Sequence, residues 1–391
     1  MVREERTVVE QQEKRRVRRR RRNVNYFDYS FLFVIIFLIC FGFLMLYSAS
    51  SYSALLKLGD SAYYLKKQLI STGVGTIALL ICTFFDYNKY QKYIKLIYFG
   101  AILSVFLVLT PLGLEFNGAR RWIGVGSISI QPAEFVKLAV IITMAHLITI
   151  NYKKLRNWKV MAQILIYALI GAAVVAVVTS NLSSAIIILG IAIVMLFVAS
   201  PQYKIFVVVA VLCVILVGAF IGISFISGDE FRLSRLLVWL EPEKYSDTGG
   251  YQILQGLYAI GSGGVFGKGL GQSVQKLGFI PEAQNDYIFT IICEELGLIG
   301  AISVIMLFVF IIRRMFVIAG SAPNLFGSML VTGVMAHISI QVFLNIAVVT
   351  NSIPNTGVTL PFISYGGTSV VFLMSEVGIV LAVSRSIRRM R

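Results

Sequence analysis

Charged residues are scarce in this chain: Asp, Glu, Lys and Arg make up 14% of its 391 residues, whereas 57% are hydrophobic. A soluble domain keeps roughly a quarter of its residues charged, so this composition excludes an ordinary soluble protein. Histidine and cysteine are also rare, and no cluster of metal-ligand or disulfide spacing occurs. The four cysteines lie in or beside apolar runs and are interpreted as small buried hydrophobes: Cys40, Cys82, Cys213 and Cys293.

Long apolar runs dominate the rest of the chain. A membrane-spanning helix needs about 20 apolar residues, whereas the strands of a membrane barrel alternate over about 10, so these continuous runs exclude a barrel. The sequence therefore predicts an all-α, polytopic membrane bundle of ten transmembrane helices forming one domain, 28–384. The predicted spans are 28–50, 68–86, 92–111, 132–150, 159–178, 182–200, 204–226, 288–312, 325–349 and 358–384.

The net charge of +16 is distributed unevenly along the chain. With the N-terminus inside, 24 of the 35 Lys and Arg fall at inner ends and ten outside. The positive-inside rule then places both basic tails, 1–27 and 385–391, in the cytoplasm. The run from Lys14 to Arg22 resembles a nucleic-acid arm, but its position before the first span favours a topology anchor attracted to anionic lipid. Nucleic acid is not a predicted partner.

Three segments interrupt the apolar runs on the predicted outer side: 51–67, 112–131 and 227–287. The last, between spans seven and eight, is the longest and carries most of the outer charge. Its glycine-dense part, 249–272, is not a Walker loop. Ser262 stands where that pattern requires its first glycine, and Gly269 follows Lys268 where it requires Ser or Thr.

The segment PEAQNDYIFTIICEELG, 281–297, holds the leading catalytic candidate, Asp286, at the outer mouth of span eight. Placing an ionisable group at the mouth of a membrane span costs free energy, which favours a functional role. The alternative is structural: Asn285 or Asp286 caps the free N–H groups at the start of the helix. The two interpretations do not exclude each other.

Glu134 and Lys137 lie three residues apart at the outer start of span four. They predict either a self-neutralising ion pair or a polar patch that lines an outer cavity. Lys and Arg on the predicted outer side are exceptions to the positive-inside rule. An anionic ligand at the outer leaflet would explain them, since the arginine guanidinium binds phosphates well. These outer cations are Arg120, Arg121, Arg232, Arg235, Lys268 and Lys276.

Polar residues also occur deep in the predicted bundle. His337, Gln341 and Asn345 recur every four residues along span nine and predict either contacts between helices or a substrate path. Glu376 in span ten is a lone carboxylate, for which partnered burial and a proton-linked role are both open.

Three segments give the chain a resemblance to a known family: NGARRWIGVGSISIQPAEFVK (117–137), PEAQNDYIFTIICEELG (281–297) and IPNTGVTLPFISYGGTS (353–369). The chain resembles the SEDS family of shape, elongation, division and sporulation proteins along nearly its whole length. Its basic N-terminal extension and the FISYGGTS motif are more similar to the FtsW/SpoVE branch than to RodA. The resemblance implies a ten-span peptidoglycan glycosyltransferase with 227–287 as the outer catalytic loop. The usual His-Thr before the catalytic Asp is here Gln284-Asn285.

The resemblance also implies roles for individual residues. Asp286 would be the general base that activates the acceptor sugar of lipid II. Substrate would bind to Arg120, Arg121, Glu134, Lys137, Lys268, Lys276 and Ser364, with the first two arginines and Lys137 facing the pyrophosphate leaving group. No cofactor is required by the sequence, although a divalent cation, Mg²⁺ or Mn²⁺, is compatible with Asp286 and pyrophosphate.

The implied partners are lipid II, a class B penicillin-binding protein and divisome or sporulation proteins, in a bacterial cell membrane. Two other functions fit ten spans and a lipid substrate: a lipid II flippase, and a scaffold for the transpeptidase. Polar signals cluster at the outer mouths of the spans, which favours surface chemistry over passage.

Overall fold

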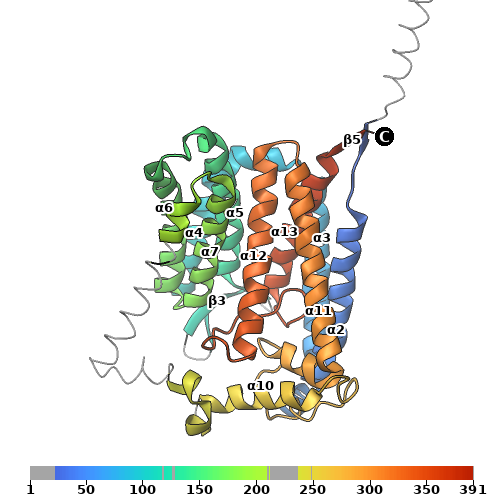
Figure 1. Cartoon of the computed structure of the whole chain (residues 1–391). Helices are drawn as coiled ribbons and strands as arrows, with labels where there is room; N and C mark the ends of the chain where they lie inside the picture. Colours follow the sequence, from blue (N-terminus) through green and yellow to red (C-terminus); the bar gives the residue numbers. More distant parts are fainter. Residues whose placement is uncertain are drawn as a thin grey trace, which may run out of the picture.

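The computed structural model describes residues 23–116, 119–125, 128–208, 211, 237–247 and 249–390, and within these residues helices dominate. Nine described helical segments are long and apolar enough to cross a membrane. They lie side by side in one bundle, and the shorter α10 (Gly250–Gly263) lies across one end (Figure 1). The nine are α2 (Tyr29–Leu58), α3 (Tyr63–Phe84), α4 (Ile94–Phe106) with flanking 3₁₀ turns, α5 (Pro132–Asn151), α6 (Trp158–Val178), α7 (Leu182–Ala199), α11 (Ile288–Ser321), α12 (Leu325–Val349) and α13 (Thr368–Ser386).

Nine of the ten predicted spans therefore coincide with helices, and the seventh, 204–226, lies mostly outside the described residues. The tenth prediction, 358–384, is wrong at its start, because α13 begins only at Thr368. Pro361 has no backbone N–H to donate, and the next residue, Phe362, has a left-handed φ of 66°. Residues 353–367 consequently form an irregular segment, here called the re-entrant segment.

The fold is all-α as expected, apart from two small antiparallel sheets in the described residues. β2 (Gly113–Phe116), β3 (Ala119–Val125) and β4 (Ile128–Ile130) form a three-stranded sheet in the loop before α5. β1 (Asn23–Asn25) pairs with β5 (Arg388–Met390), which holds the two chain ends together. The hydrophobicity pattern pointed only to loops here, since strands of three to seven residues carry little periodic signal.

The chain ends and α10 lie at opposite ends of the bundle (Figure 1). At the terminal end, Arg314 forms an ion pair with the buried Asp28 at 2.6 Å, which ties α11 to the start of α2. The first and last described strands, β1 and β5, therefore lie on the same side of the bundle. Which end faces the cytoplasm stays a prediction from the charge distribution.

The re-entrant segment reaches the interior because α2 leaves space for it. A Cβ on Gly42 would lie 2.6 Å from the carbonyl oxygen of Phe362, closer than any side chain allows. Small residues let backbones approach closely in membrane bundles. Gly42 therefore lets this non-helical backbone pack against protein instead of lipid, as membrane depth requires.

Candidate active site

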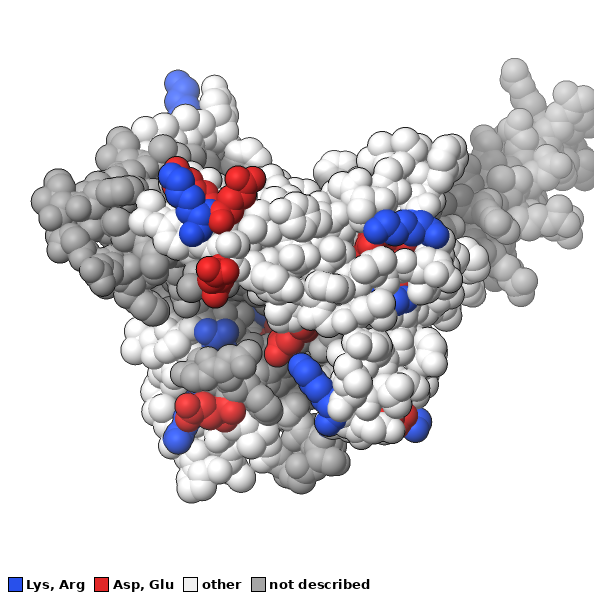
Figure 2. Space-filling model, turned by 90° about the horizontal axis from the view of Figure 1, so that it is seen from below, with Lys and Arg blue, Asp and Glu red and all other residues white. Residues whose placement is uncertain are grey.

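A cavity of about 890 Å³ opens at the α10 end of the bundle. The cavity draws on all three segments that carry the sequence motifs. Its lining comes from α2, α3, β3, β4, α5, α7, α10, α12, α13, the loop before α11 and the re-entrant segment. Acidic and basic side chains lie close together on this face (Figure 2). A site with converging polar groups in a large concavity is the leading candidate for chemistry.

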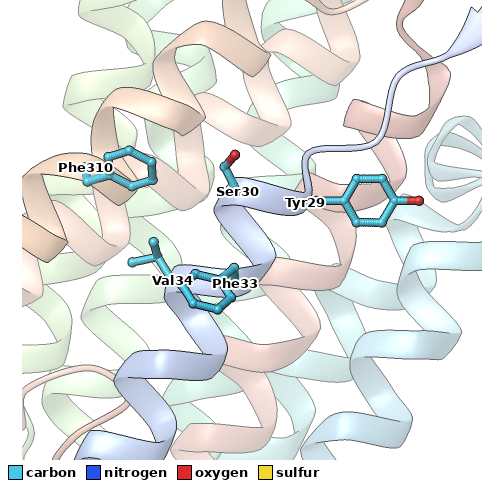
Figure 3. Close-up of a pocket in the computed structure, with 5 residues that line it drawn as sticks. All are labelled: Tyr29, Ser30, Phe33, Val34 and Phe310. Carbon is cyan, nitrogen blue, oxygen red and sulfur yellow. The ribbon is translucent and has the colours of Figure 1, made fainter.

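A second depression lies on the side of the bundle, between α2 and α11. Its lining is mainly apolar: Tyr29, Ser30, Phe33, Val34 and Phe310 (Figure 3). It contains no carboxylate and no cation, and most of its side chains are highly exposed on a surface that lipid would cover. It is therefore not a candidate for chemistry.

Asp286 lines the main cavity, and its backbone is held from two sides. The Asn345 amide donates to the carbonyl oxygens of Asp286 and Val358, both at 2.7 Å. The Tyr365 N–H donates to the Gln284 carbonyl oxygen at 2.9 Å. These bonds fix the loop before α11 against α12 and the re-entrant segment, and therefore fix the position of the carboxylate.

The structural alternative for Asp286 is wrong. The N-cap position of α11 is Tyr287, and no side chain caps this helix. The Asn285 amide instead donates to the Glu282 carboxylate at 2.9 Å. The Asp286 carboxylate is thus not committed to a cap.

The surroundings of Asp286 make it a stronger base than an exposed aspartate. Removal from water raises the pKa of its carboxyl group from 3.8 to about 6, and the negative charge of Glu282 acts in the same direction. A backbone hydrogen bond partly opposes this shift. A pKa close to neutral is the range in which a carboxylate serves as a general base.

Glu134 and Lys137 satisfy both predictions made for them. The Lys137 ammonium lies 2.7 Å from a Glu134 carboxylate oxygen, and both side chains are almost fully buried. Both residues also line the cavity. The pair consequently presents a desolvated cation to any ligand there.

The two neighbouring arginines of β3 lie in different surroundings. Arg121 lines the cavity and donates to the Ser180 carbonyl oxygen at 2.9 Å. Arg120 is exposed, forms an ion pair with Glu115 at 3.3 Å and does not line the cavity. Successive residues of a strand point to opposite faces, so the structure brings only one of this pair to the site.

Lys268 and Lys276 lie outside the cavity, against the two acids of α11. Lys268 pairs with Glu294 at 2.7 Å, and Lys276 pairs with Glu295 at 2.9 Å. Ser48 of α2 also donates to Glu295 at 2.7 Å. These contacts attach the 264–280 segment to the bundle, and substrate contact by either lysine stays an untested prediction.

Breaking the deeper of these two pairs should destabilise the protein. Lys276→Met would leave Glu295, which is fully buried, with a single hydroxyl donor, at a cost of about 3–5 kcal/mol of folding free energy. Lys268→Met is the matched control. Lys268 is one-third exposed, and Glu294 keeps bonds from Ser273 and two backbone N–H groups. Thermal unfolding in detergent should show a clearly larger fall in Tm for Lys276→Met, and equal falls would contradict this assignment.

Ser364 is the last predicted substrate residue, and it is buried inside the re-entrant segment. Its hydroxyl accepts a hydrogen bond from the Leu360 N–H at 2.8 Å, and it does not line the cavity. The structure therefore gives the Ser364 hydroxyl a contact within the turn of the re-entrant segment, and not a place in the cavity wall.

The deep polar residues of α12 have partners in α13 and in the re-entrant segment. His337 of α12 contacts the Glu376 carboxylate of α13 at 2.9 Å, which is the partnered burial left open above. Gln341 donates to the Thr359 carbonyl oxygen at 3.0 Å and also reaches the cavity lining. The stripe thus connects α12 to its neighbours, and Gln341 places part of it in the cavity wall.

Several cavity residues were missed by sequence reasoning. The most distinctive are aromatic or cationic: Tyr63, Tyr64, Lys67, Trp122 and Tyr365. The dipeptide Tyr63-Tyr64 with Lys67 could have been found as an aromatic and basic cluster at a span mouth. It was assigned instead to the loop 51–67.

The chain is similar to known proteins over almost its whole length. The model of the FtsW/RodA/SpoVE family, described as cell cycle protein, matches residues 29–389. Stage V sporulation protein E of Bacillus subtilis is 38% identical, with 92% of this chain and 97% of that protein covered. The probable peptidoglycan glycosyltransferase FtsW of Trichlorobacter lovleyi is 34% identical, with 93% and 94% covered.

Solved structures share the fold. One chain in a structure of a peptidoglycan synthase complex superposes with a TM-score of 0.75 at 24% identity, covering 92% of this chain and 98% of that chain. The rod shape determining protein RodA of Thermus thermophilus gives 0.64 at 24% identity, covering 92% and 97%. By the family match and these relatives, the chain belongs to the FtsW/RodA/SpoVE family of cell cycle proteins.

Proposed function

We propose that this chain is a peptidoglycan glycosyltransferase that polymerises lipid II into glycan strands, with Asp286 as the general base. Relatives that are 34–36% identical over most of the chain carry the name of this activity. The observation that carries the assignment of the base is that Asp286 shares one cavity with Lys137 and Arg121. A base near neutral pKa and a pair of cations are the two elements that glycosyl transfer from a pyrophosphate requires.

The reaction follows from these positions. The Asp286 carboxylate takes the proton from the 4-hydroxyl of the acceptor GlcNAc as that oxygen attacks C1 of the donor MurNAc. The new C1–O4 bond forms while the bond from C1 to the phosphate oxygen breaks, and the lipid pyrophosphate leaves with the electron pair. Attack opposite the leaving group inverts the anomeric carbon. Lys137 and Arg121 stabilise the charge that develops on the pyrophosphate.

A divalent cation would have few ligands from the protein itself. Among the described residues, no group of three or more His, Cys, Asp or Glu is placed to hold a metal. Asp286 would share such an ion with the pyrophosphate oxygens of the substrate. The reaction above assigns it no step.

Membrane placement and partners form part of the proposal. The charge distribution supports a multi-pass orientation with both tails in the cytoplasm and the cavity at the outer leaflet. The resemblance to the FtsW/SpoVE branch supports a class B penicillin-binding protein as partner, and divisome or sporulation proteins around it.

Purified chain with labelled lipid II, its transpeptidase partner and Mg²⁺ tests the proposal. Glycan ladders are the expected product.

The buried His337–Glu376 pair favours the second candidate, a lipid II flippase, because such pairs also occur on transport paths. Translocation of lipid II in vesicles without any ladder would establish that alternative and overturn polymerisation.

The rate of polymerisation should depend on pH through Asp286. A general base works when ionised, and its pKa of about 6 predicts half-maximal kcat/KM near pH 6. Below that point the rate should fall about tenfold per pH unit, and above pH 7 it should be nearly constant until another group titrates. A profile that stays flat down to pH 5 would contradict Asp286 as the base.

A further inference from the structure

The cavity has two walls of different chemistry. α5, α7 and β3 contribute the cations Lys137 and Arg121, the Glu134 carboxylate that pairs with Lys137, the Trp122 ring and neutral polar side chains. α3 and the re-entrant segment contribute Tyr63, Tyr64 and Tyr365, here called the aromatic wall. α3 packs against α2 and α13, whereas α5 and α7 pack against each other and α12, so the helices that carry the two walls lie on different sides of the bundle (Figure 1).

The three rings of the aromatic wall form one cluster. The Tyr63 and Tyr64 centroids are 5.5 Å apart at 90°, and those of Tyr64 and Tyr365 are 5.1 Å apart at 78°. The Lys67 ammonium lies 4.6 Å from the Tyr63 centroid. All three rings are only half-buried, and their hydroxyls make no hydrogen bond within the described part of the chain.

We propose that the aromatic wall is a carbohydrate subsite that holds a hexopyranose ring of the acceptor lipid II, an inference that rests on the proposed function. A pyranose with equatorial hydroxyls presents axial C–H groups on each face, and these pack against the electron-rich face of an aromatic ring. Tyr63 contributes its ring face, and the Tyr64 and Tyr365 hydroxyls with the Lys67 ammonium supply the donors that sugar hydroxyls need around such a contact.

The position of Asp286 assigns the wall to the acceptor. The base must reach the acceptor hydroxyl, and the loop that carries it is bonded to the wall through the Tyr365 N–H and the Gln284 carbonyl oxygen. The donor is anchored through its pyrophosphate, which belongs with Lys137 and Arg121. Acceptor sugar on the aromatic side and donor pyrophosphate on the cationic side then meet at Asp286.

Binding of a soluble sugar tests the subsite without relying on turnover. The probe is the β-1,4-linked GlcNAc tetramer, measured by saturation-transfer NMR with the full chain carrying Asp286→Asn. In that parent, transfer to the sugar ring protons is expected. Tyr63→Phe keeps a planar face and should bind equally, whereas Tyr63→Leu keeps apolar volume without the face and should bind about 3- to 10-fold more weakly.

Two further variants make the result decisive. Tyr365→Leu should weaken binding to a similar degree, which keeps the test open where Tyr63→Leu does not fold. Tyr167→Leu removes a half-exposed ring of α6 that pairs with Tyr98 away from the cavity, and it should bind like the parent. Absence of transfer in the parent, or Leu variants of the wall that bind like the parent, would overturn the subsite. Sugar binding through the wall in a chain that makes no glycan ladders would instead reject only the polymerase assignment.

Discussion

Replacing Asp286 by Asn is expected to lower the rate of lipid II polymerisation by about 10²- to 10⁴-fold, the usual contribution of a positioned general base. Asn is nearly the same size as Asp but cannot accept a proton from the attacking hydroxyl. The loop should keep its place, because the bonds that fix it, from Asn345 and Tyr365, involve backbone carbonyl oxygens. The measurement is the initial rate of glycan-ladder formation with the transpeptidase partner present.

Two controls separate lost chemistry from lost structure. Tm should not fall in Asp286→Asn, because a neutral amide avoids placing a charge in a poorly hydrated position. Asp286→Glu keeps the carboxylate one methylene further out and should retain part of the rate, with a pH profile of the same sign. Ladders from Asp286→Asn at the wild-type rate, with wild-type Tm, would remove this residue as the base.

The sequence predicted the membrane bundle well because each span carries its own signal. About 20 apolar residues in a row define a spanning helix regardless of what packs against it. The errors lie where hydrophobicity and backbone geometry disagree. Residues 358–367 are apolar enough to extend a span, yet Pro361 and the left-handed Phe362 turn the backbone away. Conversely, Lys66 and Lys67 interrupt the apolar run, although α3 continues through them to Tyr63.

The candidate site was predictable only in part, for a related reason. Asp286, Glu134 and Lys137 stood out because each is an ionisable residue at a span mouth. The partners of Lys268 and Lys276 are 26 and 19 residues away in a different element, and no periodicity links them. Their charge alone therefore suggested a ligand contact, which stays a prediction, and gave no sign of the two buried acids that they pair with. Pairings of this kind depend on tertiary contacts, which one sequence does not reveal.

Lys137→Met is expected to have the second largest effect, on both stability and activity. It removes the partner of Glu134, whose carboxylate is almost fully buried, and breaking such a pair costs about 3–5 kcal/mol. The second carboxylate oxygen of Glu134 already lacks a hydrogen-bond partner among the described residues, so little remains to compensate the charge. The same change removes a cation from the pyrophosphate side of the cavity. Tm in detergent and the rate of ladder formation should both fall.

The double variant Lys137→Met with Glu134→Gln separates these two effects. Neutralising both members removes the unpaired buried charge, so Tm should recover most of the loss. The rate should stay low, since no ammonium remains to stabilise the leaving pyrophosphate, and removing one such group lowers rates by about 10²- to 10³-fold. Recovery of both Tm and rate would mean that Lys137 serves only to neutralise Glu134. Arg121 of β3 would then stabilise the charge of the leaving pyrophosphate without help from Lys137.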